Sequence, residues 1–349
     1  MKIALYSDLH LEFMRDAPWQ PPALDADVVI LAGDIDRHTR GIEWSRGAFP
    51  YSRILYVAGN HEFYGGSLLD LAQLREAATC ANIDFLENDC VVIDGVRFLG
   101  AVLWSSFTLY GEGEHQALAM RSAKNSINDY HIIRGSDGKP LEPRETARLH
   151  SKTVAFLTSE LAKPFDGKTV VVTHFSPHGG TIHPAHEGNP LTPYFATDLS
   201  WLIAQNKIDL WAFGHSHTNN DFIAEGGCRI LSNQRGYARE AANGNGFRED
   251  LIIDLNHSNP VTHTEKKLEH SDRPDEKVFV ACFEHIVKAV DRRFDVRNCI
   301  LATLATDCLD HNNVLSNPVR EKYRECVQDG VFDLIESCAR NFHRMSPEN

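Results

Sequence analysis

The 349-residue sequence predicts an α/β layered fold, and three observations lead to that class. Short runs of Val, Ile and Leu, typical of strands buried on both faces, recur along the first 255 residues. Helical stretches separate several of these runs, as in a sheet with crossover connections. The pair Asp94-Gly95 joins two runs through a tight turn and so adds an antiparallel hairpin.

The elements follow from these patterns in chain order. The expected strands cover residues 2–6, 27–32, 53–57, 90–93, 96–104, 168–173, 208–213, 229–232 and 250–255. Residues 67–78 show the three-to-four spacing of an amphipathic helix. Residues 105–165 are polar and helical with a loop at 135–140, and we interpret them as an insertion near the site. Residues 175–193 hold too many prolines and glycines for regular structure.

The sequence after residue 255 differs from the strand-rich part before it in being polar first and helical afterwards. Residues 1–255 are expected to form one domain. Residues 256–276 are polar, charged and interrupted by proline, so we expect a linker. Residues 277–349 are expected to form a helical C-terminal extension, in which Asn317 caps a helix that begins with Pro318. Its apolar stripe predicts packing against the core or a homo-oligomer formed through these helices.

Composition narrows the function classes. The net charge of -13 disfavours broad attachment to nucleic acid or to anionic lipid, although bound cations can reverse the field locally for a phosphate ester. The apolar start of the chain is too short for a signal peptide, and no run is long enough for a membrane span. The eight cysteines form no C-x-x-C pair, which predicts buried free thiols and a cytoplasmic location.

Polar side chains follow five of the predicted strands, at the edge where open α/β sheets bind ligands. They are Asp8 and His10, Asp34, Asn60 and His61, His174, and His215 and His217. Alternate residues of an extended strand end point the same way, so Asp8 and His10 are expected to reach one ion, and the same holds for His215 and His217. Carboxylate, amide oxygen and imidazole suit Mn, Fe or Zn better than calcium. The ligands are too many for one four-coordinate ion and match two ions that share a carboxylate.

These blocks, Asp-x-His, Gly-Asp, Gly-Asn-His-Glu, a strand-end His and Gly-His-x-His, resemble in their order the calcineurin-like metallophosphoesterase superfamily. The resemblance spans roughly residues 1–255. It implies a two-sheet β-sandwich flanked by helices (α/β/β/α), with a dinuclear metal centre at the sheet edge. It also implies the ligand sets: Asp8, His10, Asp34 and His217 for one ion, and Asp34, Asn60, His174 and His215 for the other, with Asp34 bridging.

The resemblance further implies a metal-dependent phosphoesterase in which a hydroxide activated by the two ions, manganese above all, attacks phosphorus. His61 would lie outside the metal shell and donate a proton to the leaving alkoxide. Compared with the protein Ser/Thr phosphatase branch, Asp36 and Arg37 lie one place early, and Ala58 replaces an arginine. Residues 104–107, 128–130 and 232–237 instead resemble a prokaryotic group of small phosphoesterases.

Several readings remain open. The expected substrate is a small phosphomonoester or phosphodiester; the alternatives are a nuclease, a cyclic-nucleotide phosphodiesterase and a non-catalytic metal-binding scaffold. Arg235 either holds a substrate phosphate as a planar fork or is a solvated loop arginine. His178, together with His183 and His186, either lines the substrate cleft or belongs to a polar surface loop. Glu62 either fixes a ligand histidine or is a carboxylate at a helix start.

Overall fold

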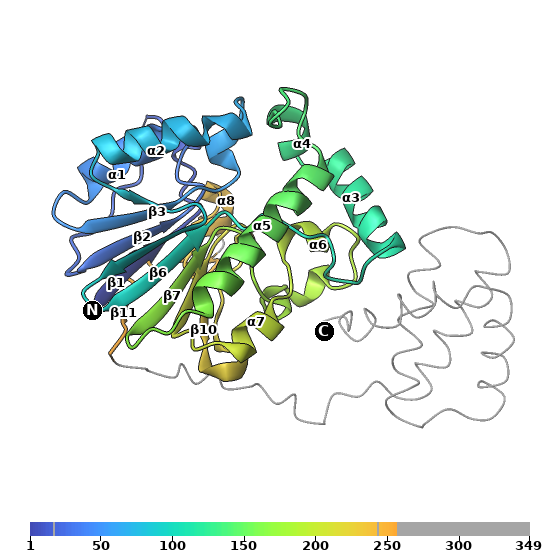
Figure 1. The fold of residues 1–349 in the computed structure, drawn as a ribbon. Helices are drawn as coiled ribbons and strands as arrows, with labels where there is room; N and C mark the ends of the chain where they lie inside the picture. Colours follow the sequence, from blue (N-terminus) through green and yellow to red (C-terminus); the bar gives the residue numbers. More distant parts are fainter. Residues whose placement is uncertain (17, 243, 257–349) are drawn as a thin grey trace, which may run out of the picture. The chain divides into compact units, whose positions relative to one another are not determined.

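Two mixed β-sheets pack face to face, with helices on their outer faces (Figure 1). The computed structural model describes residues 1–256 except 17 and 243. The two-sheet α/β fold expected from the resemblance is therefore confirmed. The expected C-terminal helices at 277–349, and the linker beyond residue 256, lie outside the described residues.

The first sheet has the strand order β11-β1-β2-β3-β4. Its strands are β1 (Lys2–Tyr6), β2 (Val28–Ala32), β3 (Arg53–Val57), β4 (Asp84–Phe85) and β11 (Ile252–Asp254). The first four are parallel, and β11 closes one edge antiparallel to β1, with Lys2 opposite Asp254. The parallel strands direct their carboxyl ends to a common edge.

The second sheet has the order β5-β6-β7-β8-β10-β9. Its strands are β5 (Asp89–Ile93), β6 (Val96–Ala101), β7 (Lys168–Thr173), β8 (Leu210–Phe213), β9 (Asp221–Ile223) and β10 (Arg229–Ser232). The four central strands are parallel, whereas β5 and β9 form antiparallel edges. The hairpin predicted at Asp94-Gly95 joins β5 to β6.

Helices cover both sheets from outside. They are α1 (Arg40–Ala48), α2 (Leu71–Cys80), α3 (Glu114–Ser126), α4 (Asp129–Ile132), α5 (Pro143–Leu161), α6 (Thr192–Phe195), α7 (Ser200–Gln205) and α8 (Ala238–Ala242). Figure 1 shows α1 and α2 over the first sheet and α5 over the second. Among the described residues, no helix is both long and apolar enough to cross a bilayer.

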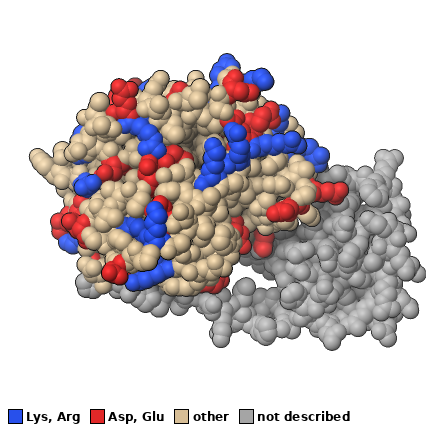
Figure 2. Space-filling view, viewed as in Figure 1, with Lys and Arg blue, Asp and Glu red and all other residues tan. Residues whose placement is uncertain are grey.

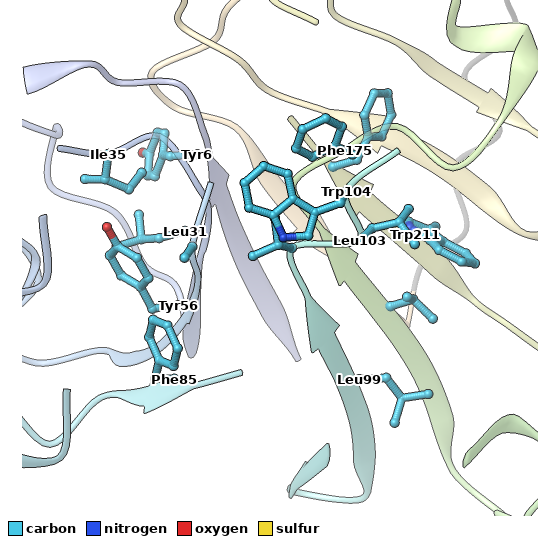
Figure 3. Packing of buried hydrophobic residues seen from close by; sticks show 14 of the residues in the cluster. Tyr6, Leu31, Ile35, Tyr56, Phe85, Leu99, Leu103, Trp104, Phe175 and Trp211 are labelled. Atoms are coloured by element: carbon cyan, nitrogen blue, oxygen red, sulfur yellow. The ribbon is translucent and has the colours of Figure 1, made fainter. Parts of the chain in front are cut away.

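The core has one layer between the sheets and further layers under the helices. Ile3 and Leu5 belong to the cluster between the sheets, where they join Val170 and Val172, whereas the alternate residue Tyr6 belongs to the outer cluster. Figure 3 shows part of that outer cluster beside each sheet. Because both faces are buried, the strands read as continuous apolar runs instead of alternating ones.

Some element boundaries differ from expectation. The strand expected to reach Trp104 ends at Ala101, because Leu103 (φ 74°) and Trp104 (φ 48°) adopt a left-handed backbone that cannot continue a ladder. The helix expected at 67–78 begins as a 3-10 turn capped by Ser67 and continues as α2. Strands β4 and β9 escaped prediction because they are only 2 and 3 residues long. The expectation of buried thiols holds for Cys228 but is wrong for the exposed Cys80 and Cys90.

Candidate metal centre

Seven candidate ligands gather where strands of both sheets end. Asp8, Asp34 and Asn60 follow β1, β2 and β3 of the first sheet, whereas His174 and His215 follow β7 and β8 of the second. A hydrogen bond of 2.9 Å from His174 Nδ1 to the carbonyl oxygen of Ala32 ties the two sheet edges together. Apart from the half-buried His217, all the candidate ligands are at most 7% exposed.

Five of these ligands have a left-handed backbone, with φ between 48° and 75°: Asp8, His10, Asp34, His215 and His217. A left-handed conformation costs a non-glycine residue roughly 1–2 kcal/mol, and such outliers concentrate at functional sites. The backbone is therefore not extended at these positions. The side chains of Asp8 and His10 do reach the same cluster, as expected. They do not reach it because alternate residues of an extended strand point the same way, which was the reason given for the prediction.

The first cluster contains Asp8, His10 and His217, whose candidate ligand atoms all lie within 4.8 Å of one another. His10 Nε2 lies 3.0 Å from His217 Nε2. On the far side of each ring a carboxylate faces Nδ1: Glu12 at 3.3 Å from His10, and Glu240 at 2.6 Å from His217. We assign the ring proton of each histidine to Nδ1, which faces a carboxylate. The lone pairs of the two Nε2 atoms then face each other. A cation between them would stabilise that arrangement.

The second cluster contains Asp34, His174 and His215. His174 Nε2 lies 3.4 Å from Asp34 Oδ1 and 3.1 Å from Asn60 Oδ1. His215 Nε2 is buried and has no hydrogen-bond partner among the described residues. Burial and the neighbouring His174 hold the pKa of His215 well below its usual range, so its imidazole is neutral, the form that binds metal. A buried nitrogen without a partner is costly, and a metal ion would satisfy it.

Asp34 faces both clusters. Its Oδ2 lies 3.9 Å from His10 Nε2, whereas its Oδ1 is the oxygen near His174. Burial opposes ionisation of this carboxyl, but the nearby histidines, His174 first, outweigh it and hold the pKa of Asp34 well below its usual range. The expectation that His215 shares a cluster with His217 is wrong, because each adopts a left-handed backbone and the two side chains diverge.

His61 lies beside the second oxygen of Asp34, at 3.8 Å from Nε2 to Oδ2. Its Nδ1 lies 2.7 Å from Oε1 of Glu12, and Tyr64 stacks on its ring at 3.9 Å between centroids. Burial lowers the pKa of His61, but Asp34 and Glu12 outweigh it and raise that pKa above its usual value. Sequence reasoning missed Glu12; its only signal was its place two residues after His10.

Asn60 is held by a residue that sequence reasoning did not assign to the site. Its Nδ2 donates to Asp129 Oδ1 at 2.8 Å, which turns Oδ1 of Asn60 toward His174. The hydroxyls of Tyr64 and Tyr194 also donate to Asp129, at 2.9 and 2.5 Å. Because Asp129 begins α4, the helical stretch 105–165 reaches the site through this buried carboxylate.

Glu62 fixes the loops that carry the ligands. Its carboxylate accepts hydrogen bonds from the backbone nitrogens of Asp34 and Gly59, at 3.1 and 2.7 Å, and from the hydroxyl of Tyr56 at 2.8 Å. Burial and the charge of Asp34 raise the pKa of Glu62 to about 7. Glu62 does lie at a helix start, in the first turn of the 3-10 helix His61–Phe63, but its carboxylate bonds to the backbone of the ligand loops instead of fixing a ligand histidine.

Two glycines of the motifs are required by close approach. A Cβ on Gly59 would lie 2.6 Å from the backbone nitrogen of Asp34, and one on Gly214 would lie 2.6 Å from Asp8 Oδ2. Real Cβ contacts are essentially never under 3.0 Å. A side chain at either position would displace a candidate ligand.

The expected substrate residues lie in different surroundings. Arg235 lines a cavity of about 330 Å³ together with His10, Phe13 and Tyr237, directly beside the first cluster. His178 accepts a hydrogen bond from the backbone of Gly180, its Nε2 lies 3.4 Å from Glu225 Oε2, and its ring packs on Phe222.

Arg37, which was noted only for its place in the Gly-Asp block, also lies near the centre. Its guanidinium sits 5.7 Å from the ring centroid of Tyr64, which stacks on His61, and 5.9 Å from that of Phe13. Its Nε is buried and has no hydrogen-bond partner among the described residues. The Nε–H group of Arg37 can therefore donate a hydrogen bond to a ligand next to His61, the candidate proton donor.

Comparisons with known proteins find similarity in sequence and in fold. An uncharacterised protein of Acanthamoeba polyphaga mimivirus is 28% identical over 290 residues, which is 73% of this chain and 99% of that protein. The phosphopantetheinyl hydrolase of Mycobacterium tuberculosis has a similar fold, with a TM-score of 0.55 and 19% identity over 69% of this chain and 92% of its own. A dimetal phosphatase from Danio rerio aligns with a TM-score of 0.38 and 14% identity, covering 66% of this chain and 86% of its own.

The family itself is identified by sequence. Residues 1–219 match the calcineurin-like phosphoesterase family. This match spans the strands that precede all seven candidate ligands, from Asp8 to His217. The chain belongs to the calcineurin-like phosphoesterase family.

Proposed function

We propose that this protein hydrolyses a small phosphomonoester or phosphodiester with two divalent ions bound in the candidate metal centre. One observation carries the proposal: two buried clusters of aspartate and histidine meet at Asp34, which faces both. When bound, such ions polarise the phosphoryl oxygens and lower the pKa of a water molecule. Manganese is the expected metal, with iron or zinc as alternatives, because the ligands mix hard oxygen with imidazole nitrogen.

Each ligand has a role in this proposal. Asp8, His10 and His217 hold one ion. Asn60, His174 and His215 hold the other, and Asp34 contributes one oxygen to each side. The carboxylates behind His10 and His217 and the carbonyl behind His174 fix the ring orientations, as is common for metal-binding histidines.

His61 donates the proton that the leaving alkoxide needs. Glu12 holds Nδ1, which leaves Nε2 facing the site near Asp34. Asp34 and Glu12 raise the pKa of His61, which favours the protonated ring that a general acid requires. Arg37 and Arg235 lie on the same side as Phe13 and are the candidate donors to the substrate phosphate.

Nucleic acid is a less favoured substrate. Figure 2 shows Lys and Arg side chains in a band over α3 and α5, with Asp and Glu beside them. Together with the net charge of -13, this mixed surface gives little of the continuous positive field that nucleic-acid binding uses. Assays with single-stranded and duplex DNA at physiological salt separate the two substrate classes.

The proposal is tested on the full chain, stripped of metal and reloaded with Mn²⁺. We expect hydrolysis of p-nitrophenyl phosphate or of bis-p-nitrophenyl phosphate, and its loss on chelation or in Asp34→Ala. His131→Ala changes an exposed histidine of α4 and serves as the matched control for His61→Ala, which should slow turnover. Activity that survives both metal removal and Asp34→Ala would refute the proposal.

A further inference from the structure

A cavity of about 350 Å³ adjoins the candidate metal centre on the side of the histidine-rich loop. Ser216 lines the cavity and separates the candidate ligands His215 and His217 in the sequence. Phe195, from α6, also lines it, and its ring centroid lies 5.3 Å from that of His215. The cavity therefore lies beside the segment that carries His215 and His217. The volume falls at the lower end of the range of about 300–1,000 Å³ found for ligand pockets.

Most of the wall of this cavity is apolar, and the exposed side chains of His183, His186 and Asn189 add polar groups to it. Ile182, Leu191 and Phe195 contribute half-buried apolar side chains, and the buried Ala196 adds a methyl group. Among the described residues, no Lys, Arg, Asp or Glu lines the cavity. The apolar part of such a wall favours burial of apolar surface, and of the residues that line the cavity only the two histidines can carry a positive charge.

The hydroxyl groups of the wall are already used within the protein. Thr181, Thr192 and Thr218 each donate to a main-chain carbonyl oxygen of their own loop, at 2.8, 2.6 and 3.4 Å. A ligand that relied on these hydroxyls as donors would have to break internal hydrogen bonds. These three hydroxyls therefore add little to the recognition of a sugar or another polyhydroxyl group.

We propose that this cavity binds the organic group of the phosphoester substrate and selects an uncharged, apolar group, an alkyl chain or an aryl ring. The inference rests on the proposed function, because it requires the substrate phosphate to lie at the metal centre. It assigns specificity to the loop 181–196 and to the segment after β8, and it disfavours nucleoside polyphosphates, whose further phosphates would meet no Lys or Arg side chain in this wall.

Alkylphosphonates from methyl to hexyl test the inference, since their C–P bond resists hydrolysis and their affinity is independent of turnover. Their binding to the full chain loaded with Mn²⁺ is measured by isothermal titration calorimetry. We expect the affinity to rise about fourfold for each added methylene, the factor that corresponds to burial of one CH₂. An affinity that stays flat from methyl to hexyl would overturn the inference.

Two isoleucines provide a matched pair of variants. Ile182→Ala removes part of the wall and should weaken hexylphosphonate about tenfold while leaving methylphosphonate unchanged. Ile223→Ala makes the same change at a position that is 52% exposed and outside the cavity, so it should leave both affinities unchanged. Leu191→Ala replaces the first variant if that one does not fold. Equal losses in the wall and control variants contradict the assignment.

Hydrolysis of methyl phosphate by the same preparations separates this inference from the proposed function. If methyl phosphate is hydrolysed but phosphonate affinity does not change with chain length, the proposed specificity pocket is refuted and the phosphoesterase activity is supported. If phosphonate affinity rises with chain length but no ester is hydrolysed, the proposed pocket is supported and the phosphoesterase activity is refuted.

Discussion

Asp129→Asn tests whether a carboxylate outside the metal ligands positions Asn60. Asp129 Oδ1 accepts from Asn60 Nδ2 and from the Tyr64 hydroxyl, whereas Oδ2 accepts from the Tyr194 hydroxyl. An asparagine at position 129 can keep its oxygen toward Asn60, and its NH₂ then faces Tyr194, whose hydroxyl can accept. In the flipped orientation two NH₂ groups meet, and the amide of Asn60 is pushed out of line.

The magnitude follows from the loss of charge. Hydrogen bonds to a charged group contribute about 1.5–3 kcal/mol each, against about 0.5–1.5 kcal/mol for neutral pairs. Three weakened bonds, offset by the easier burial of a neutral amide, lead to an expected loss of about 1–3 kcal/mol in unfolding free energy. Because Asn60 is held less firmly, the affinity for Mn²⁺ should fall about 10–100-fold, the usual effect of losing a residue that orients a ligand.

Calorimetric titration of the metal-stripped full chain with Mn²⁺, together with urea unfolding, measures both effects. Tyr130→Phe is the control, since Tyr130 follows Asp129 in α4 but its hydroxyl pairs with Thr146. That variant should bind Mn²⁺ like the unmodified protein. The reasoning fails if Asp129→Asn loses stability as expected and yet binds Mn²⁺ with unchanged affinity.

Two further predictions concern buried carboxyl groups. Glu12→Gln should lower the pKa of His61 and slow the cleavage of alkyl phosphates about tenfold or more beyond any slowing of p-nitrophenyl esters, whose leaving group needs no proton and whose rate reports the weaker hold on His10; equal slowing of both esters speaks against His61 as the donor. Burial raises the pKa of Glu87 from 4.5 to about 7, so the stability that its proton contributes is present at low pH and is lost as the pH rises through about 7. Glu87→Gln keeps an acceptor for the backbone nitrogen of Val102 and should match the unmodified protein near pH 4 but exceed it by about 1–3 kcal/mol at pH 8 in urea unfolding; a difference that does not change with pH contradicts this.

Most of the fold and the candidate ligands could be predicted because their signals are local. Long apolar runs such as Val28–Ala32 mark strands buried on both faces, and the polar residue after each run marks the sheet edge. The backbone conformation at the candidate ligands could not be predicted from the sequence. Asp8 and His10 reach one cluster through left-handed turns, which depend on neighbouring loops and leave no periodic trace in the sequence.

The supporting residues of the site could not be predicted for a different reason. Asp129 acts through its contact with Asn60, which is 69 residues away in sequence. Glu12 contacts the nearby His10, but its contact with His61 spans 49 residues. A lone carboxylate in a sequence is usually solvated, so nothing distinguishes these two until the chain is folded. Glu62, by contrast, lay within the recognised motif, but its bonds to the backbone of Asp34 and Gly59 depend on how two loops meet.

The division of the ligands between two sheets links metal binding to the docking of those sheets. Asp8, Asp34 and Asn60 are carried by the first sheet, and His174 and His215 by the second. Neither half alone presents either cluster, so a partly folded chain with separated sheets cannot bind the ions as the native protein would. Divalent cations should consequently act as a cross-link across the sandwich, slowing its opening and making ion uptake a late event in folding.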